Sequence, residues 1–109
     1  QHRCRSDRRL EFDPAEIEAK VHYDDLYAGT IDRIGVLNGE LIQLEIKTGT
    51  KPKWVGMQTA AYNAAWCRMG FETPKKRFCL ELKKTGKYSL SELNNPNDEF
   101  DFFSILWIK

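Results

Sequence analysis

The fold is decided by one stretch of sequence, YAGTIDRIGVL-NG-ELIQLEIKT, at residues 27–48. Its two arms, residues 27–37 and 40–48, are rich in the β-branched and apolar residues that are typical of strands. Asn38-Gly39 between the arms favours a two-residue hairpin turn, because both residues tolerate the positive φ that such a turn requires. The stretch therefore predicts an antiparallel pair of strands.

The turn also predicts which side chains face each other across the hairpin. Counting back from Asn38-Gly39 places Asp32 opposite Glu45 and Thr30 opposite Lys47. Glu45 and Lys47 are two residues apart and share one face of their strand. Two carboxylates and one ammonium group are thus expected together on the sheet.

This grouping has two interpretations. Like charges that face each other at ~5 Å with an effective dielectric constant near ~20 repel by roughly 3 kcal/mol, and a bound Mg²⁺ or Mn²⁺ would offset that repulsion. The alternative is a solvated salt-bridge triad that contributes little to stability. Spacing alone leaves both open. The neighbouring apolar residues favour the metal site, because they indicate central strands rather than a solvated edge: Ile31, Ile42, Leu44 and Ile46.

The rest of the chain predicts further strands and helices around this hairpin. Asp13-Pro14 is typical of the start of a short helical turn, and Gly70 of a helix C-cap. The expected elements are a strand at 17–23, a helix at 53–69, a strand at 77–83, a short strand at 87–90 and a closing helix at 100–108. Their order predicts a small sheet covered by helices.

Length, charge and cysteine spacing limit the class of protein. The 109 residues fit a single domain, with residues 1–12 expected to be flexible or the remnant of a longer N-terminal region. No apolar run approaches the ~20 residues of a membrane span.

The net charge of +1 hides basic clusters at residues 1–9 and 75–87 and an acidic one at 92–101. Each cluster is either a solvated rim or a contact for a charged partner. The three cysteines lack Cys-x-x-Cys spacing, which argues against a disulfide framework and against a cysteine-ligated metal. A reducing compartment is therefore expected, namely the cytoplasm, or the host cytoplasm if the chain is phage-encoded.

Three short motifs occur in order across the hairpin and the helix that follows it. They are Gly29-Thr30-Ile31-Asp32, Glu45-Ile46-Lys47-Thr48-Gly49 and Gln58-Thr59-Ala60-Ala61-Tyr62. Together they resemble the PD-(D/E)XK nuclease superfamily, and more narrowly its RecB-type and phage lambda exonuclease-like branch. The resemblance covers residues 18–62, and Ile31 stands where the superfamily's name has proline.

The resemblance implies an α/β restriction-endonuclease-like core, a central mixed β-sheet of four to five strands flanked by α-helices. It implies that Asp32 and Glu45 hold Mg²⁺ or Mn²⁺, with the Ile46 carbonyl and the upstream Glu18 as further ligands. Lys47 would be the catalytic lysine. Gln58 and Tyr62 would lie beside the active site on one face of their helix.

The expected function is a metal-dependent DNA nuclease, exonuclease-like, in phage or bacterial DNA recombination or processing. Lys51, Lys53 and Trp54 are candidate DNA contacts, although we expect Trp54 to pack on the sheet instead. A homo-oligomer or a recombination partner protein stays open. The alternative function is a non-catalytic module that keeps the fold and binds nucleic acid or protein. A sugar- or nucleotide-binding domain finds no Gly-rich phosphate loop to support it.

Overall fold

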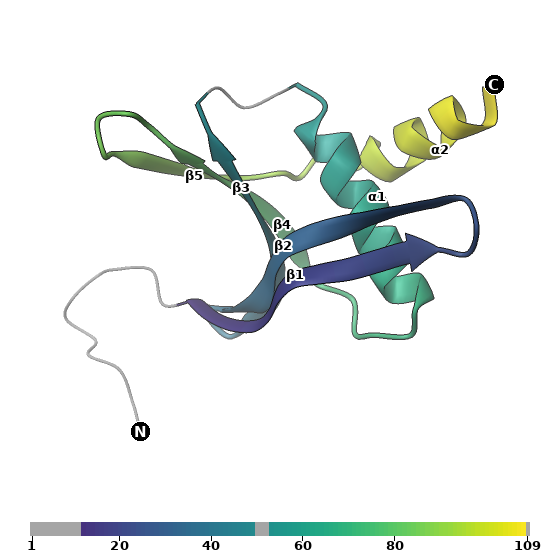
Figure 1. The fold of residues 1–109 in the computed structure, drawn as a ribbon, viewed down its shortest axis with the longest axis horizontal. Helices are drawn as coiled ribbons and strands as arrows, with labels where there is room; N and C mark the ends of the chain where they lie inside the picture. The colour runs from purple at the N-terminus through teal and green to yellow at the C-terminus, as the bar shows by residue number, and fades with distance from the viewer. Residues whose placement is uncertain (1–11, 50–52, 109) are drawn as a thin grey trace.

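One mixed sheet and two helices make up the part of the chain that the structure, a computed structural model, describes: residues 12–49 and 53–108. The elements in chain order are β1 (Phe12–Tyr23), β2 (Tyr27–Leu37), β3 (Glu40–Thr48), α1 (Val55–Arg68), β4 (Lys76–Leu82), β5 (Tyr88–Glu92) and α2 (Asp98–Ile108). The strands follow each other in the sheet as β1-β2-β3-β4-β5 (Figure 1). Only β3 and β4 are parallel, and α1 makes the crossover that a parallel pair requires. The α/β fold with a mixed five-stranded sheet flanked by helices is therefore confirmed.

The hairpin forms around the predicted turn. Asn38 and Gly39 both have positive φ, 53° and 84°. The β2–β3 ladder runs in the predicted register from Leu37↔Glu40 to Arg33↔Leu44. Both strands lie in the interior of the sheet, as their apolar residues predict.

The predicted helical turn at Asp13-Pro14 is wrong, because these residues belong to β1. Pro14 lies opposite Gly35, and the register shifts between Pro14 and Glu16. β1 is an edge strand, where proline's missing N–H costs no ladder bond and a bulge is tolerated. The capping signal was thus overridden by pairing with β2.

The helix α1 packs against the first two strands through small residues. Ala61 and Ala65 are almost completely buried, which lets the helix approach the sheet closely. They join a core that also contains Ala19, Val21, Ile31, Ile34 and Trp66. The predicted C-cap is confirmed, since Gly70 has a φ of 98° and its N–H donates to the Cys67 carbonyl. Among the described residues no helix is long and apolar enough to cross a membrane.

The helix α2 packs on α1 and on the end of the β1–β2 hairpin (Figure 1). Tyr23 and Tyr27 stack on each other with ring centroids 5.5 Å apart, and Phe103 meets both rings edge-on. Phe103 is thus packed on the hairpin, whereas Phe100 is 72% exposed. The aromatic cluster fixes α2 beside the start of β2.

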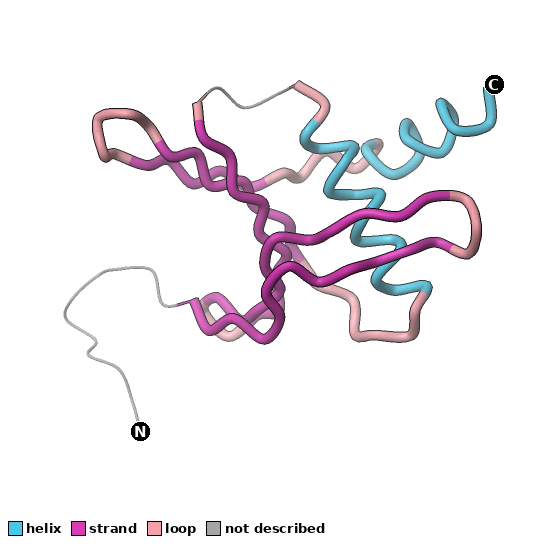
Figure 2. Tube along the Cα trace, in the orientation of Figure 1, coloured by secondary structure: helices cyan, strands magenta, loops and turns pink. Residues whose placement is uncertain are grey.

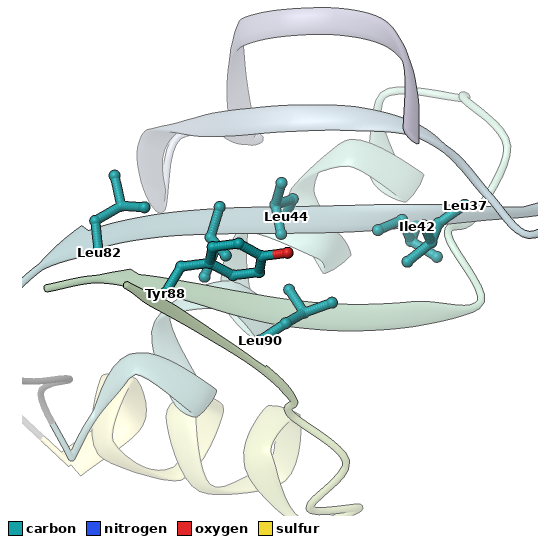
Figure 3. A pocket seen from close by; sticks show the side chains of 7 residues that line it. Leu37, Ile42, Leu44, Leu82, Tyr88 and Leu90 are labelled. Carbon is teal, nitrogen blue, oxygen red and sulfur yellow. The ribbon is translucent and has the colours of Figure 1, made fainter. Parts of the chain in front are cut away.

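Over residues 42–47 of β3, strand alternation sends apolar side chains to one face of the sheet and polar side chains to the other. Gln43 is fully buried, and its side-chain amide donates to the Thr59 carbonyl of α1, so the odd-numbered side chains of β3 face the helix. Ile42 and Leu44 point the other way, into an open apolar groove of about 250 Å³ (Figure 3). Side chains of a strand alternate between the two faces of the sheet. The alternation that directs Ile42 and Leu44 into the groove therefore places Glu45 and Lys47 on the helix side.

Candidate active site

The strands β2 and β3 diverge at the point where the predicted carboxylates lie. Their ladder stops at Arg33↔Leu44, after which β2 continues beside β1 and β3 beside β4 (Figures 1 and 2). The predicted ladder pairs Asp32–Glu45 and Thr30–Lys47 are therefore wrong. Instead, the Ile46 backbone N–H donates to Asp32 Oδ2 at 2.8 Å. The carboxylate of Asp32 bridges the opening where a ladder carbonyl would otherwise accept this bond.

Glu45 is the most unusual charged group of the site. The residue is only 6% exposed, and its Oε2 lies 3.1 Å from Lys47 Nζ. Its Oε1 is buried and has no hydrogen-bond partner among the described residues. Burial raises the pKa of Glu45, the nearby Asp32 raises it further, and Lys47 offsets part of the increase. The ionised form is thus only partly compensated by the protein itself.

This pair of carboxylates fits a hard divalent cation. A buried carboxylate oxygen without a donor, next to a second carboxylate, is a donor set that Mg²⁺ or Mn²⁺ would satisfy. Asp32 and Glu45 supply this pair. The amide of Ile46 is bonded to Asp32, while the role of its carbonyl as a ligand stays a prediction.

Glu18 lies on β1 at the level of Asp32, between the pairs Ile17↔Arg33 and Ala19↔Ile31. Its φ of 54° interrupts the regular strand, and its side chain is exposed. In the described part of the chain no three His, Cys, Asp or Glu side chains are grouped so that they could hold a metal ion. A ligand role for Glu18 therefore stays a prediction, which the side chain's position does not support.

The third motif is joined to the first by close packing. Gln58 and Tyr62 lie one turn apart on α1, and Gln58 Nε2 donates to the Tyr62 hydroxyl at 3.4 Å. The Tyr62 ring lies on Gly29 so closely that a Cβ at Gly29 would stand 2.2 Å from the ring. Gln58 Oε1 is buried without a hydrogen-bond partner among the described residues. The first motif thus contacts the second through Asp32 and Ile46, and the third through Gly29 and Tyr62.

The three candidate DNA contacts have different outcomes. Lys51 lies outside the described residues. Lys53 is exposed. Trp54, which we expected to pack on the sheet, is 57% exposed and lines a cavity with Gln58 and Tyr62. The expectation of sheet packing for Trp54 is therefore wrong, because the residue stands at the N-cap of α1, before its first turn, and is exposed there.

The basic cluster at residues 75–87 is split between the two ends of β4. At one end, Lys76 pairs with Glu40 at 3.2 Å. At the other, the turn between β4 and β5 exposes three lysines: Lys83, Lys84 and Lys87. This turn directly follows the parallel pairs Lys47↔Glu81 and Thr48↔Leu82, so its lysines extend from the same end of the sheet as Lys47.

A buried ion pair that the sequence did not reveal holds the first turn of α1. Arg77 Nη2 lies 3.2 Å from Asp98 Oδ2, and both side chains are largely buried. Arg77 Nη1 also donates to the Gly56 carbonyl at 2.7 Å and to Thr59 Oγ1 at 3.0 Å. One arginine of β4 thus fixes the starts of α1 and α2, and with them the position of Gln58. No local pattern pointed to this pair, because its partners belong to clusters of opposite charge that are distant in sequence.

Comparisons with known proteins bear on the fold alone. No family model matches the sequence, and no curated protein matches it. Among solved structures, the crystal structure of SSO0001 is similar, with a TM-score of 0.50 and 20% sequence identity. The similar region covers 83% of this chain and 47% of SSO0001, so the chain spans less than half of that protein.

Proposed function

We propose that this chain is a Mg²⁺- or Mn²⁺-dependent DNA nuclease of the PD-(D/E)XK type, acting in DNA recombination or processing in the cytoplasm. The observation that carries the proposal is the buried Glu45, with one oxygen unpartnered among the described residues and the other 3.1 Å from Lys47, beside Asp32. A purely structural sheet gains nothing from a buried carboxylate whose neighbour raises its pKa. A phosphodiesterase that uses a divalent cation needs such a pair.

Asp32 and Glu45 would hold the cation, which when bound supplies stabilisation of phosphoryl negative charge and lowers the pKa of a water. The water oxygen forms the new bond to phosphorus while a bridging P–O bond breaks, and the leaving oxygen takes up a proton. Asp32 is fixed for its role by the Ile46 N–H, and Glu45 by burial.

Lys47 is the electrostatic group of the proposed reaction. Its ammonium group is partly exposed, at 26% of the side chain, so it can face both Glu45 and a bound phosphate. From there it orients the attacking water and stabilises the charge that develops on the phosphoryl oxygens.

DNA binding is proposed to be led by the phosphate backbone. Lys53 and the lysines of the β4–β5 turn are exposed at the end of the sheet where Lys47 lies. Contacts of this kind are tolerant of sequence and weaken steeply with salt. The acidic residues at 98–101 belong to the first turn of α2, where the charge of Asp98 is paired with Arg77.

The test is cleavage of end-labelled linear DNA and of closed circular DNA, with Mg²⁺, Mn²⁺ or EDTA. Metal-dependent loss of the linear DNA alone, strongly slowed by Lys47→Ala, indicates an exonuclease that uses this site. Nicking of the circle keeps the site and makes the protein an endonuclease. Lys76→Ala, at the far end of β4, is the matched lysine control and should cleave normally. No cleavage with either metal by the folded protein would overturn the proposal and favour a non-catalytic binding module.

A further inference from the structure

A cavity of about 310 Å³ opens beside the candidate active site, between the start of β2, α1 and α2. Its walls are mainly aromatic: Tyr27, Trp54, Tyr62 and Phe102, with Gln58 among them. The wall is held firmly on one side, since the Tyr27 hydroxyl donates to the Ala61 carbonyl at 2.7 Å and the Tyr27 ring meets Phe102 edge-on. The cavity is therefore a formed feature of the fold.

Two groups in this wall lack the environment that they prefer. Gln58 Oε1 is buried with no donor among the described residues, although its Nε2 is bonded to Tyr62. A buried carbonyl oxygen without a donor is costly, so this oxygen indicates a missing N–H or O–H group. Trp54, in the same cavity wall, is 57% exposed. A flat occupant with an apolar face and an N–H on its edge would satisfy both.

We propose that this cavity, built on the site assigned under the proposed function, binds one unpaired nucleobase at the end of the DNA, stacked on Trp54 and donating an N–H to Gln58 Oε1. Each of the four bases has an N–H on its Watson–Crick edge, so the pocket tolerates sequence. A paired base has that edge occupied. The substrate class is therefore DNA with a frayed or single-stranded end, rather than a fully paired end.

The position of the cavity suits this role. Tyr62, in its wall, lies on Gly29, and Gly29 is three residues before Asp32 on β2. At ~3.3 Å per strand residue, the cavity and the carboxylates are about 10 Å apart. An extended nucleotide or two spans a comparable length. A terminal base in the cavity would thus set which phosphate reaches Asp32 and Glu45.

The test compares binding of two labelled duplexes in EDTA by fluorescence anisotropy. One carries a short single-stranded overhang, and the other carries the same overhang with abasic sites; 3′ and 5′ overhangs are measured separately. Loss of one stacked base should weaken binding by about 5- to 140-fold for the unaltered protein. Trp54→Ala should bring the ratio of the two affinities near one, and Trp54→Phe should keep part of it.

Two further variants separate a base pocket from a general effect on DNA binding. Gln58→Met keeps the size of the side chain but removes the acceptor, together with the amide donor to Tyr62, so it should lower the ratio. Phe100→Ala removes an aromatic ring that is 72% exposed and absent from the cavity wall, so it should leave the ratio unchanged. An equal effect of Phe100→Ala and Trp54→Ala would overturn the pocket.

Failure of this inference can be told apart from failure of the proposed function. If the unaltered protein cleaves DNA but binds both overhangs equally, the base pocket is wrong and the nuclease stands. If it discriminates the overhangs through Trp54 but cleaves with neither metal, the pocket stands and the nuclease is wrong. Thermal unfolding of each variant confirms that it is folded before the ratio is interpreted.

Discussion

Substituting Gly29 by alanine tests the contact that joins the first sequence motif to the third. The added Cβ would lie 2.2 Å from Tyr62 Cε1, 2.4 Å from Cζ and 2.8 Å from Cδ1, where ordinary contact begins at 3.4 Å. The ring must therefore move by about 1.2 Å, the difference between 3.4 and 2.2 Å, inside a packed core. Overpacking of this kind costs about 1–3 kcal/mol. At about 4–8 °C per kcal/mol for a small domain, the melting temperature should fall measurably.

A double-mutant cycle with Tyr62→Ala identifies the cause of that loss. In the Tyr62→Ala background the space beside Gly29 is empty, so Gly29→Ala should cost little there, and the coupling energy should equal most of the single-mutant loss. Circular dichroism melts of the four proteins measure it, with Ala28→Ser, an exposed neighbour on β2, as the control. A loss that is equal in both backgrounds would refute the reasoning and assign the glycine to backbone conformation instead.

Three other variants test the buried charges and the basic turn. Glu45→Gln removes a carboxylate whose pKa is raised by burial first and by a neighbouring carboxylate second. Because the pKa of Glu45 is raised in the folded state, protonation of Glu45 stabilises the fold in acid, and this gain is lost as pH rises through that pKa. In EDTA, the melting temperature of Glu45→Gln should therefore exceed that of the unaltered protein at neutral pH, and the difference should shrink in acid. A lower melting temperature of the variant at neutral pH would contradict this. Arg77→Ala leaves Asp98 buried without its ion pair and should lower the free energy of unfolding in urea by about 3–5 kcal/mol, whereas a change below ~1 kcal/mol would deny the pair a structural role. Lys83→Ala combined with Lys84→Ala should reduce the slope of log affinity for DNA against log salt by roughly 0.9 per lysine, and an unchanged slope would remove the turn from the DNA interface.

Local sequence was sufficient for the hairpin and insufficient for the opening inside it. The Asn38-Gly39 turn set the pairing down to Arg33↔Leu44 because register follows from turn chemistry. Beyond that pair β2 keeps only β1 as its partner and β3 keeps only β4, a divergence that no residue of the hairpin specifies. The opening matters most, because there the Ile46 N–H donates to the Asp32 carboxylate near Glu45 instead of to a ladder carbonyl.

The same limit applies to the basic residues and to the start of β1. Residues 75–87 look like one cluster in sequence, yet a strand of seven residues carries its ends about 20 Å apart, and Arg77 turns inward to Asp98. At Asp13-Pro14 the local signal favoured a helix, and pairing of an edge strand with β2 prevailed. In both places long-range contacts decided what short-range patterns could not.

The most direct test of the central claim measures bound Mn²⁺ and single-turnover DNA cleavage on the same samples of unaltered protein and Lys47→Ala. Asp32 and Glu45 remain in the variant, so the account predicts that electron paramagnetic resonance detects a bound ion in both proteins. Cleavage should be fast in the unaltered protein and slower by about 10²- to 10³-fold in Lys47→Ala. Equal cleavage rates in the two proteins, or no bound Mn²⁺ in the unaltered one, would contradict the assignment of Asp32, Glu45 and Lys47 as a metal-dependent catalytic centre.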